Sequence, residues 1–194
     1  MGFRPANKKQ NMGKLFWTLM YKLTGWKVVG KLSETEKKCV MIVAPHTSLW
    51  DFPVGLGSRA ILGFEAKYLA KKELFKNPII GFLLKAIGGI PVDRGNKSNG
   101  IVDSVVKYFD DNEEFIVALT PEGTRKYVKR WKTGFYRIAK QANVPIVMVG
   151  FDFKRKVVEF MDPFYLTDDM DADLEHIQTY FRGITGRNPE LGVK

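Results

Sequence analysis

The chain has 194 residues, of which 45% are hydrophobic and 27% charged, a globular composition that excludes a largely disordered protein. Its formal net charge of +10 favours anionic partners: phosphate groups, nucleic acid or an acidic membrane surface. The single cysteine excludes an internal disulfide, and the presence of only two histidines excludes a Cys/His zinc site.

Helical and strand patterns alternate along the chain. In chain order, the pattern predicts a helix over 12–24, a strand over 39–44, a helix over 51–62, a strand over 68–70, a helix over 78–87, a strand over 90–92, a helix over 98–111, a strand over 114–119, a helix over 133–143, strands over 145–153 and 156–161, and a helix over 168–183. This alternation predicts a single α/β domain with a mixed, largely parallel sheet flanked by helices.

The N-terminal segment, residues 1–31, carries seven Lys or Arg and no acidic residue, and we expect it to be distinct from the domain over 32–194. One broad face of its predicted helix is apolar, formed by Met12, Leu15, Phe16, Leu19, Met20 and Leu23. A basic amphipathic helix of this kind suits the headgroup region of an anionic membrane. The alternative is an amphipathic helix that packs its apolar face on the core. A second apolar run, 79–84, either extends this surface, lines a groove for an acyl chain or belongs to the core.

A histidine and an aspartate follow the first predicted strand, in the run PHTSLWD over 45–51. Because sites in open α/β sheets collect at the carboxyl ends of strands, His46 stands where a functional residue is expected. The Asp51 carboxylate, in the first helical turn, can reach back to the imidazole, fix its tautomer and leave the other ring nitrogen as a base. Alternatively, Ser48 and Asp51 form a variant of the helix capping box, and His46 is an ordinary loop residue.

The second candidate is the run TPEGTR, 120–125, directly after the strand predicted over 114–119. Gly123 allows a ligand to approach the backbone closely, and the planar fork of Arg125 matches a phosphate group. Glu122 can position a substrate hydroxyl or hold Arg125 in place. The alternative is an ordinary turn with a surface ion pair.

A third run, GGIPVDRG over 88–95, places Arg94 between glycines after another short strand. If the two strands are parallel, Arg94 and Arg125 converge at the same edge of the sheet. The alternative is a structural turn in which Asp93 and Arg94 simply pair.

Four blocks, in this order, resemble the PlsC-like 1-acyl-glycerol-3-phosphate acyltransferases, a family of glycerophospholipid acyltransferases. HTSLWD, 46–51, fits the H-x4-D block of that family, and GGIPVDRG resembles the block that follows it. PEGTR, 121–125, fits the next hallmark block, and VPIVMV, 144–149, resembles the last.

The resemblance implies acyl transfer without an acyl-enzyme, from acyl-CoA or acyl-carrier protein to the hydroxyl of a lysophospholipid acceptor. It implies that His46 is the general base and that Asp51 orients it. The remaining site residues would bind the acceptor: Arg94, Glu122, Gly123, Thr124 and Arg125. It implies no metal and no cofactor beyond the acyl donor. We therefore expect a cytoplasmic enzyme that is peripheral on the membrane face.

A different class of function fits the charge alone. Seven basic residues and no acidic residue lie between 123 and 151, interleaved with aromatic side chains, a pattern that also suits a non-catalytic nucleic-acid- or membrane-binding module. Such a module has no need of the His46 and Asp51 pair. The sequence therefore favours the acyltransferase, with an anionic membrane surface as a partner and no nucleic acid.

Overall fold

The structure, a computed structural model, describes residues 8–33, 36–93 and 98–194. In chain order its elements are α1 (Lys8–Thr24), β1 (Lys27–Val29), β2 (Lys38–Ala44), α2 (Asp51–Leu62), β3 (Lys67–Lys71), the 3-10 helix η1 (Lys72–Lys76), α3 (Pro78–Ala86), β4 (Gly89–Val92), α4 (Ser98–Asp111), β5 (Phe115–Leu119), α5 (Gly134–Ala142), β6 (Ile146–Asp152), β7 (Val157–Phe160), α6 (Met170–Arg182) and the 3-10 helix η2 (Pro189–Leu191).

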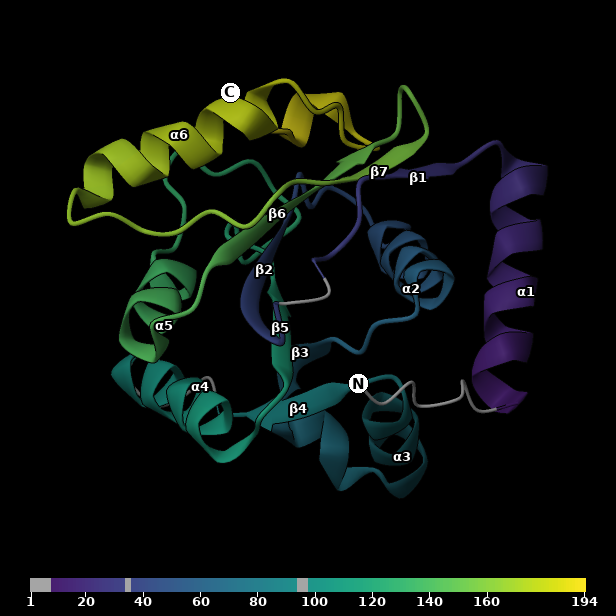
Figure 1. Cartoon of the computed structure of the whole chain (residues 1–194), viewed down its shortest axis with the longest axis horizontal. Helices are drawn as coiled ribbons and strands as arrows, with labels where there is room; N and C mark the ends of the chain where they lie inside the picture. The colour runs from purple at the N-terminus through teal and green to yellow at the C-terminus, as the bar shows by residue number, and fades with distance from the viewer. Residues whose placement is uncertain (1–7, 34–35, 94–97) are drawn as a thin grey trace.

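The strands form one seven-stranded sheet in the order β1-β7-β6-β2-β5-β3-β4 (Figure 1). Every neighbouring pair is parallel except β6 and β7, which form an antiparallel pair joined by a tight turn. The predicted α/β class with a mixed, largely parallel sheet is confirmed.

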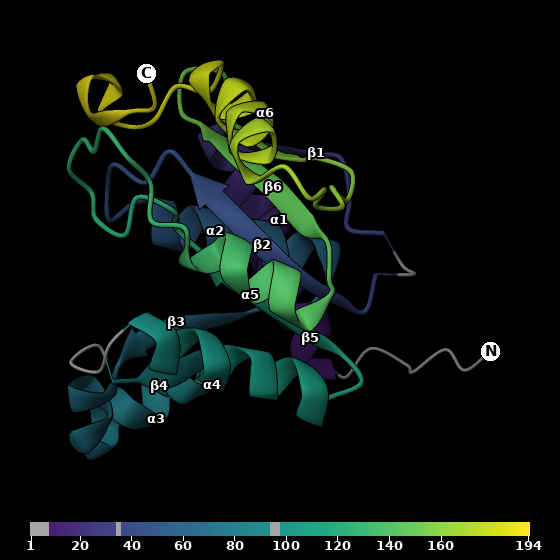
Figure 2. The ribbon, with the colours of Figure 1, turned by 90° about the vertical axis from the view of Figure 1, so that its left-hand side faces the viewer.

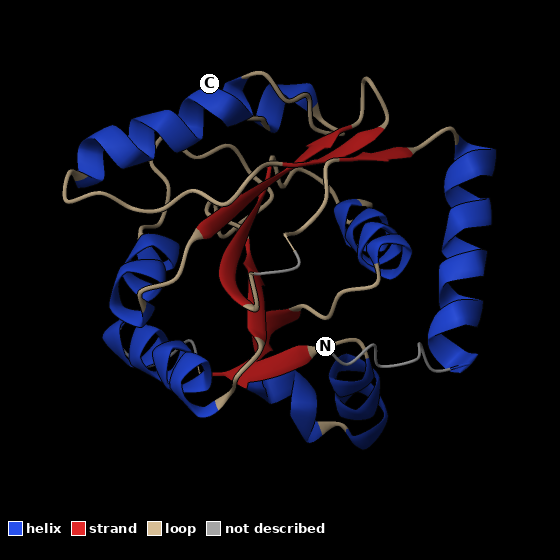
Figure 3. Cartoon of the chain, viewed as in Figure 1, coloured by secondary structure: helices blue, strands red, loops and turns tan. Residues whose placement is uncertain are grey.

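Helices cover both faces of the sheet (Figure 3). The helices α4, α5 and α6 lie on one face and α1 and α2 on the other, as the side view in Figure 2 also shows. Successive residues of β2 therefore enter different cores: Val40 and Ile42 pack under α4 and α5, whereas Cys39 and Met41 pack toward α2. A strand buried on both faces is apolar throughout, which is why this segment is recognisable in the sequence.

The element boundaries differ from the prediction where local interactions set them. The last helix begins at Met170 rather than 168, because the carboxylate of Asp169 accepts a hydrogen bond from the Ala172 N–H and caps the helix. Strand β1 was not predicted: its three residues are too few to show a strand pattern, and its order comes from pairing with β7. The two 3-10 helices were not predicted either.

Helix α1 packs against α2 through its aromatic side chains. Tyr21 is buried and its hydroxyl donates to the carbonyl oxygen of Val54, and Trp17 lies beside it. This close approach requires Gly57, since a Cβ there would lie 2.4 Å from the Tyr21 ring and 2.8 Å from Trp17. The face that contacts the protein is therefore the aromatic one, and the predicted apolar face points to solvent.

The solvent-facing side chains of α1 are Met12, Leu15, Phe16, Leu19, Met20 and Leu23. On α3, four of the six residues of the run 79–84 are likewise exposed large apolar side chains. In the described parts of the chain, no helix combines the length and hydropathy needed to cross a membrane.

Parallel pairing brings the ends of β2 and β5 together. Ile42 of β2 is in register with Leu119, the last residue of β5, so the segments that follow the two strands leave the same edge of the sheet. Those segments are 45–51 and 120–125, the two runs that the sequence analysis singled out.

Candidate active site

The imidazole of His46 is held by the carboxylate of Asp51. The Nδ1 atom lies 2.9 Å from Oδ2 of Asp51, which is 3% exposed at the first position of α2. The same oxygen accepts hydrogen bonds of 3.0 Å from the backbone N–H groups of Thr47 and Ser48. With Nδ1–H donating to the carboxylate, the lone pair resides on Nε2, so the ring can accept a proton there.

The geometry also bears on the capping alternative. Asp51 does bind backbone N–H groups, but those of the turn before the helix. The Ser48 hydroxyl accepts from the Trp50 N–H, and Trp50 is an N-cap residue without a side-chain cap. The bond from the Ser48 N–H to Asp51 is one half of the predicted capping-box variant, so the aspartate both shapes the turn and binds the imidazole.

His46 lines a cavity of about 970 Å³ at the edge of the sheet. Apolar side chains of both cores form much of its wall, among them Met41 and Val149 from one core and Val102 and Ile138 from the other. The described lining includes no residue of α3, so the apolar run 79–84 lies on the surface and not along this cavity. The cavity thus places the His46 imidazole beside a large apolar space.

The loop after β5 supplies the polar part of the same cavity. Gly123, Thr124 and Arg125 all line it. Gly123 has a φ of 64°, a left-handed conformation that favours glycine, and a Cβ there would lie 2.9 Å from Nζ of Lys132. Arg125 and His46 therefore line the same cavity.

Besides Arg59 and Lys67, two further cations that were not predicted as site residues line this cavity: Lys132 and Arg137. Both belong to the basic stretch after 125, and Arg137 lies on α5. Both are recognisable in the sequence as charge, but only the folded chain, with α5 packed against β2 and α4, brings Arg137 to the cavity. Together with Arg125 they make this wall of the cavity cationic, which suits a phosphate group.

Glu122 takes a different position from its neighbours in the loop. It is 6% exposed, and its Oε1 accepts a 3.0 Å hydrogen bond from the backbone N–H of His46. Its Oε2 has no hydrogen-bond partner among the described residues. Burial raises the pKa of the Glu122 carboxyl above its ordinary value, although the His46 N–H opposes the shift. The observed contact of Glu122 is thus with the backbone of His46.

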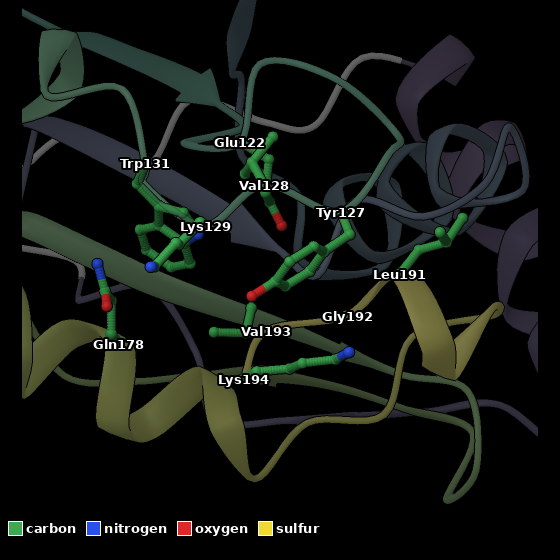
Figure 4. Close-up of a pocket in the computed structure, with 10 residues that line it drawn as sticks. All are labelled: Glu122, Tyr127, Val128, Lys129, Trp131, Gln178, Leu191, Gly192, Val193 and Lys194. Atoms are coloured by element: carbon green, nitrogen blue, oxygen red, sulfur yellow. The ribbon is translucent and has the colours of Figure 1, made fainter.

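Figure 4 shows the small cavity of about 20 Å³ that Glu122 lines on its other side. Tyr127 and Trp131 of the basic loop and Val193 near the end of the chain form its other walls. Glu122 therefore belongs to the packing between the loop after β5 and the segment after α6.

Arg94, the remaining predicted site residue, lies outside the described residues. No group of three or more His, Cys, Asp and Glu side chains within the described ranges is placed to hold a metal ion.

Comparison with known proteins finds acyltransferases. The model of the acyltransferase family matches residues 26–152. The 1-acyl-sn-glycerol-3-phosphate acyltransferase of Bacillus subtilis (strain 168) is 33% identical over 129 residues, which cover 66% of this chain and 62% of that protein. The protein of the same name from Streptococcus pneumoniae (strain ATCC BAA-255 / R6) is 29% identical over 154 residues, covering 72% of this chain and 55% of its own. The matches thus span somewhat more than half the length of these relatives.

The fold has a counterpart among solved structures. The crystal structure of the 1-acyl-sn-glycerophosphate (LPA) acyltransferase PlsC from Thermotoga maritima superimposes with a TM-score of 0.60. The likeness covers 90% of this chain and 77% of that one, at 20% sequence identity. At this identity the likeness concerns the fold.

Proposed function

This chain belongs to the acyltransferase family, and on that premise we propose that it moves a fatty acyl group from a thioester donor to a lysophospholipid hydroxyl. The donor would be acyl-CoA or acyl-carrier protein, and the acceptor a lysophospholipid such as 1-acyl-glycerol-3-phosphate. The observation that carries the proposal is the 2.9 Å bond between His46 and Asp51 beside a cavity that also has a cationic wall.

His46 acts as the general base in this mechanism. Its Nε2 takes the proton from the acceptor hydroxyl as the oxygen attacks the thioester carbonyl, forming the new carbon–oxygen bond. The carbon–sulfur bond then breaks, and the imidazolium returns the proton to the departing thiolate. Asp51, which is 3% exposed, stabilises the imidazolium and keeps the ring in the tautomer that presents Nε2.

The acceptor is bound through its phosphate and its acyl chain. Arg125 offers charge-assisted hydrogen bonds to the phosphate, and Lys132 and Arg137 raise the positive charge of the same wall. The apolar walls of the cavity receive hydrocarbon. Gly123 and Thr124 would bring the backbone and a hydroxyl close to the glycerol portion, and Arg94 stays a predicted phosphate ligand. The chemistry requires no metal and no cofactor besides the donor.

We further propose that the protein works on the cytoplasmic face of a membrane, held by anionic lipid. The exposed apolar side chains of α1 support this. The helix packs on α2 through its aromatic face, so these side chains remain exposed to solvent in the described structure. Lys14 and Lys22 on the same helix add electrostatic attraction, on the order of 1 kcal/mol for each basic residue near the surface.

Helix α3 offers a second apolar surface of the same kind. Ile79 and Phe82 are each 72% exposed, and Lys76 and Lys85 are exposed at its two ends. An apolar surface flanked by lysines fits the interface of an anionic bilayer.

The test of the function is thiol release from acyl-CoA by the purified protein, with and without lysophosphatidate. A thiol signal that depends on the acceptor, with the diacyl product found by mass spectrometry, supports the proposal. Acyl-carrier protein and other lysophospholipids in parallel reactions identify the donor and the acceptor. If no donor and acceptor pair in the panel reacts, the proposal is wrong.

A further inference from the structure

The segment after α6, 185–188, contacts the turn that carries His46. We propose that Asn188 is a positioning residue for the base: it fixes Thr47, the residue that follows His46, so that the imidazole points into the cavity while bonded to Asp51. The proposal rests on the proposed function, because it concerns the same base. Asn188 lies outside the 26–152 span of the family match, so the family comparison assigns it no role.

Asn188 binds Thr47 twice. Its side-chain Nδ2 donates a 2.8 Å hydrogen bond to the carbonyl oxygen of Thr47, and its backbone N–H donates to Oγ1 of Thr47 at 3.2 Å. Thr47 is 3% exposed, and both bonds are partly buried. Breaking these bonds would leave buried polar groups of Thr47 without a partner, which is unfavourable. The contact is therefore built to hold Thr47 in one place.

Thr47 in turn contacts the catalytic pair. It follows His46 directly, and its own N–H donates to the same Asp51 Oδ2 that holds the imidazole. A shift of the Thr47 peptide would therefore move both the carboxylate and the ring. This makes Thr47 the link through which a residue at 188 can act on the base.

The rest of the segment is fitted to the turn as well. Thr185 is tied to the end of the sheet, where its carbonyl oxygen accepts from the Phe153 N–H at 2.8 Å. Gly186 packs directly on the turn: a Cβ there would lie 2.8 Å from Thr47 Oγ1 and 3.3 Å from Pro45. These contacts hold Asn188 in place before substrate arrives.

The turn is thus held from two sides by segments distant in sequence. Glu122 accepts the N–H of His46 from one side, and Asn188 donates to the carbonyl of Thr47 from the other. Beyond Asn188 the chain continues to Leu191–Lys194, which line the small cavity together with Glu122 (Figure 4). Fixing the peptide before His46 through Glu122 and the residue after it, Thr47, through Asn188 limits the positions that the His46 backbone and its side chain can take. A misplacement of 1 Å in a reacting group can lower a rate by about 10²-fold.

The test is the kinetics of Asn188→Ala. We expect kcat to fall about tenfold, while the KM values for donor and acceptor change less than about twofold, because Asn188 is not among the residues that line the cavity. The matched control is Asn112→Ala, which removes an amide bond of the same 2.8 Å length to the carbonyl of Tyr108 on α4. That variant is expected to keep normal kinetics. A thermal melt checks that each variant is folded.

A double-mutant cycle separates positioning from a general structural role. If Asn188 acts through the pair, Asn188→Ala lowers kcat much less in the Asp51→Asn background than in the parent protein. If Asn188→Ala lowers kcat by the same factor in both backgrounds, the proposal is overturned. It is also overturned if Asn188→Ala is folded and its kcat is within twofold of that of the parent protein. If Asn188→Ala does not fold, Asn188→Asp, which is nearly isosteric and lacks the Nδ2 donor, answers the same question. If the Asn188 variants keep a normal kcat and the separate variant His46→Ala is inactive, only this inference is refuted. If His46→Ala is active, the proposed mechanism itself is refuted.

Discussion

The backbone N–H of His46 donates a 3.0 Å hydrogen bond to the carboxylate of Glu122, a residue 76 positions further along the chain. This bond joins the turn after β2 to the loop after β5, so it fixes one block of the site against the other. The predicted contact of Glu122 with substrate stays a prediction. The contact with the His46 backbone gives this residue a role that does not require substrate.

We predict that Glu122→Ala lowers kcat by about tenfold, because the buried N–H of His46 loses its acceptor and the loss of such a partner costs about 1–3 kcal/mol. Glu122→Gln keeps an oxygen at the same place and is expected to retain most of the activity. Steady-state kinetics of the two variants are the measurement. Equal losses in both would mean that the negative charge, and not the acceptor position, is what the site requires.

The raised pKa of the Glu122 carboxyl predicts a pH-dependent difference in stability. Burial favours the neutral acid in the folded protein, so ionisation of Glu122 destabilises the fold as the pH rises above the carboxyl pKa of the unfolded chain, about 4.3. Glu122→Gln cannot ionise. The melting temperature of this variant, minus that of the parent, should therefore increase between about pH 4 and pH 7. A difference that stays flat or decreases would contradict the burial argument.

Arg125→Ala is expected to raise the KM for the acceptor more than the KM for the donor. A charged hydrogen bond to phosphate contributes about 1.5–3 kcal/mol, which corresponds to roughly a 10- to 150-fold change. Lys126→Ala is the matched control, since this neighbouring cation is exposed and is not among the residues that line the cavity. A similar rise for donor and acceptor would indicate that Arg125 is structural.

Membrane binding is best tested without deleting α1, because Tyr21 and Trp17 of that helix pack on Gly57. Leu15→Ser with Leu19→Ser changes only exposed apolar side chains and is expected to cut co-sedimentation with anionic vesicles sharply. Turnover of a short-chain soluble acceptor should survive. Tyr165→Ser, an exposed residue between β7 and α6, is the control.

Salt separates the two contributions to that binding. The Debye length falls from about 10 Å at 0.1 M to about 3 Å at 1 M, so the electrostatic part weakens while the apolar part persists. We therefore expect high salt to release the parent protein only partly. Equal sedimentation of the parent and the double variant at both salt concentrations would return α1 to a purely structural role.

The parts of the site that could be predicted are those that are local in the sequence. His46 and Asp51 are five residues apart, on either side of a strand-to-helix junction, so their pairing follows from the local pattern. The contacts of Glu122 with His46 and of Asn188 with Thr47 join positions 76 and 141 residues apart, and only the assembled sheet brings them together.

The same distinction holds for the fold. The α/β class and the buried strand β2 follow from apolar runs that a sheet covered on both faces imposes. Strand β1 and the aromatic contact of α1 with α2 depend on partners elsewhere in the chain. The sequence pattern identified the apolar face of α1, but the structure was needed to show that the opposite face packs on the protein.

The central claim is that His46 is the base. The most direct measurement is kcat of purified His46→Ala, from thiol release with acyl-CoA and lysophosphatidate, alongside Asp51→Asn and melting curves for both. General-base loss commonly costs 10²–10⁴-fold, so we predict a fall of at least about 10²-fold for His46→Ala, a smaller fall for Asp51→Asn, and intact melting transitions. Folded His46→Ala with near-normal turnover would contradict the account.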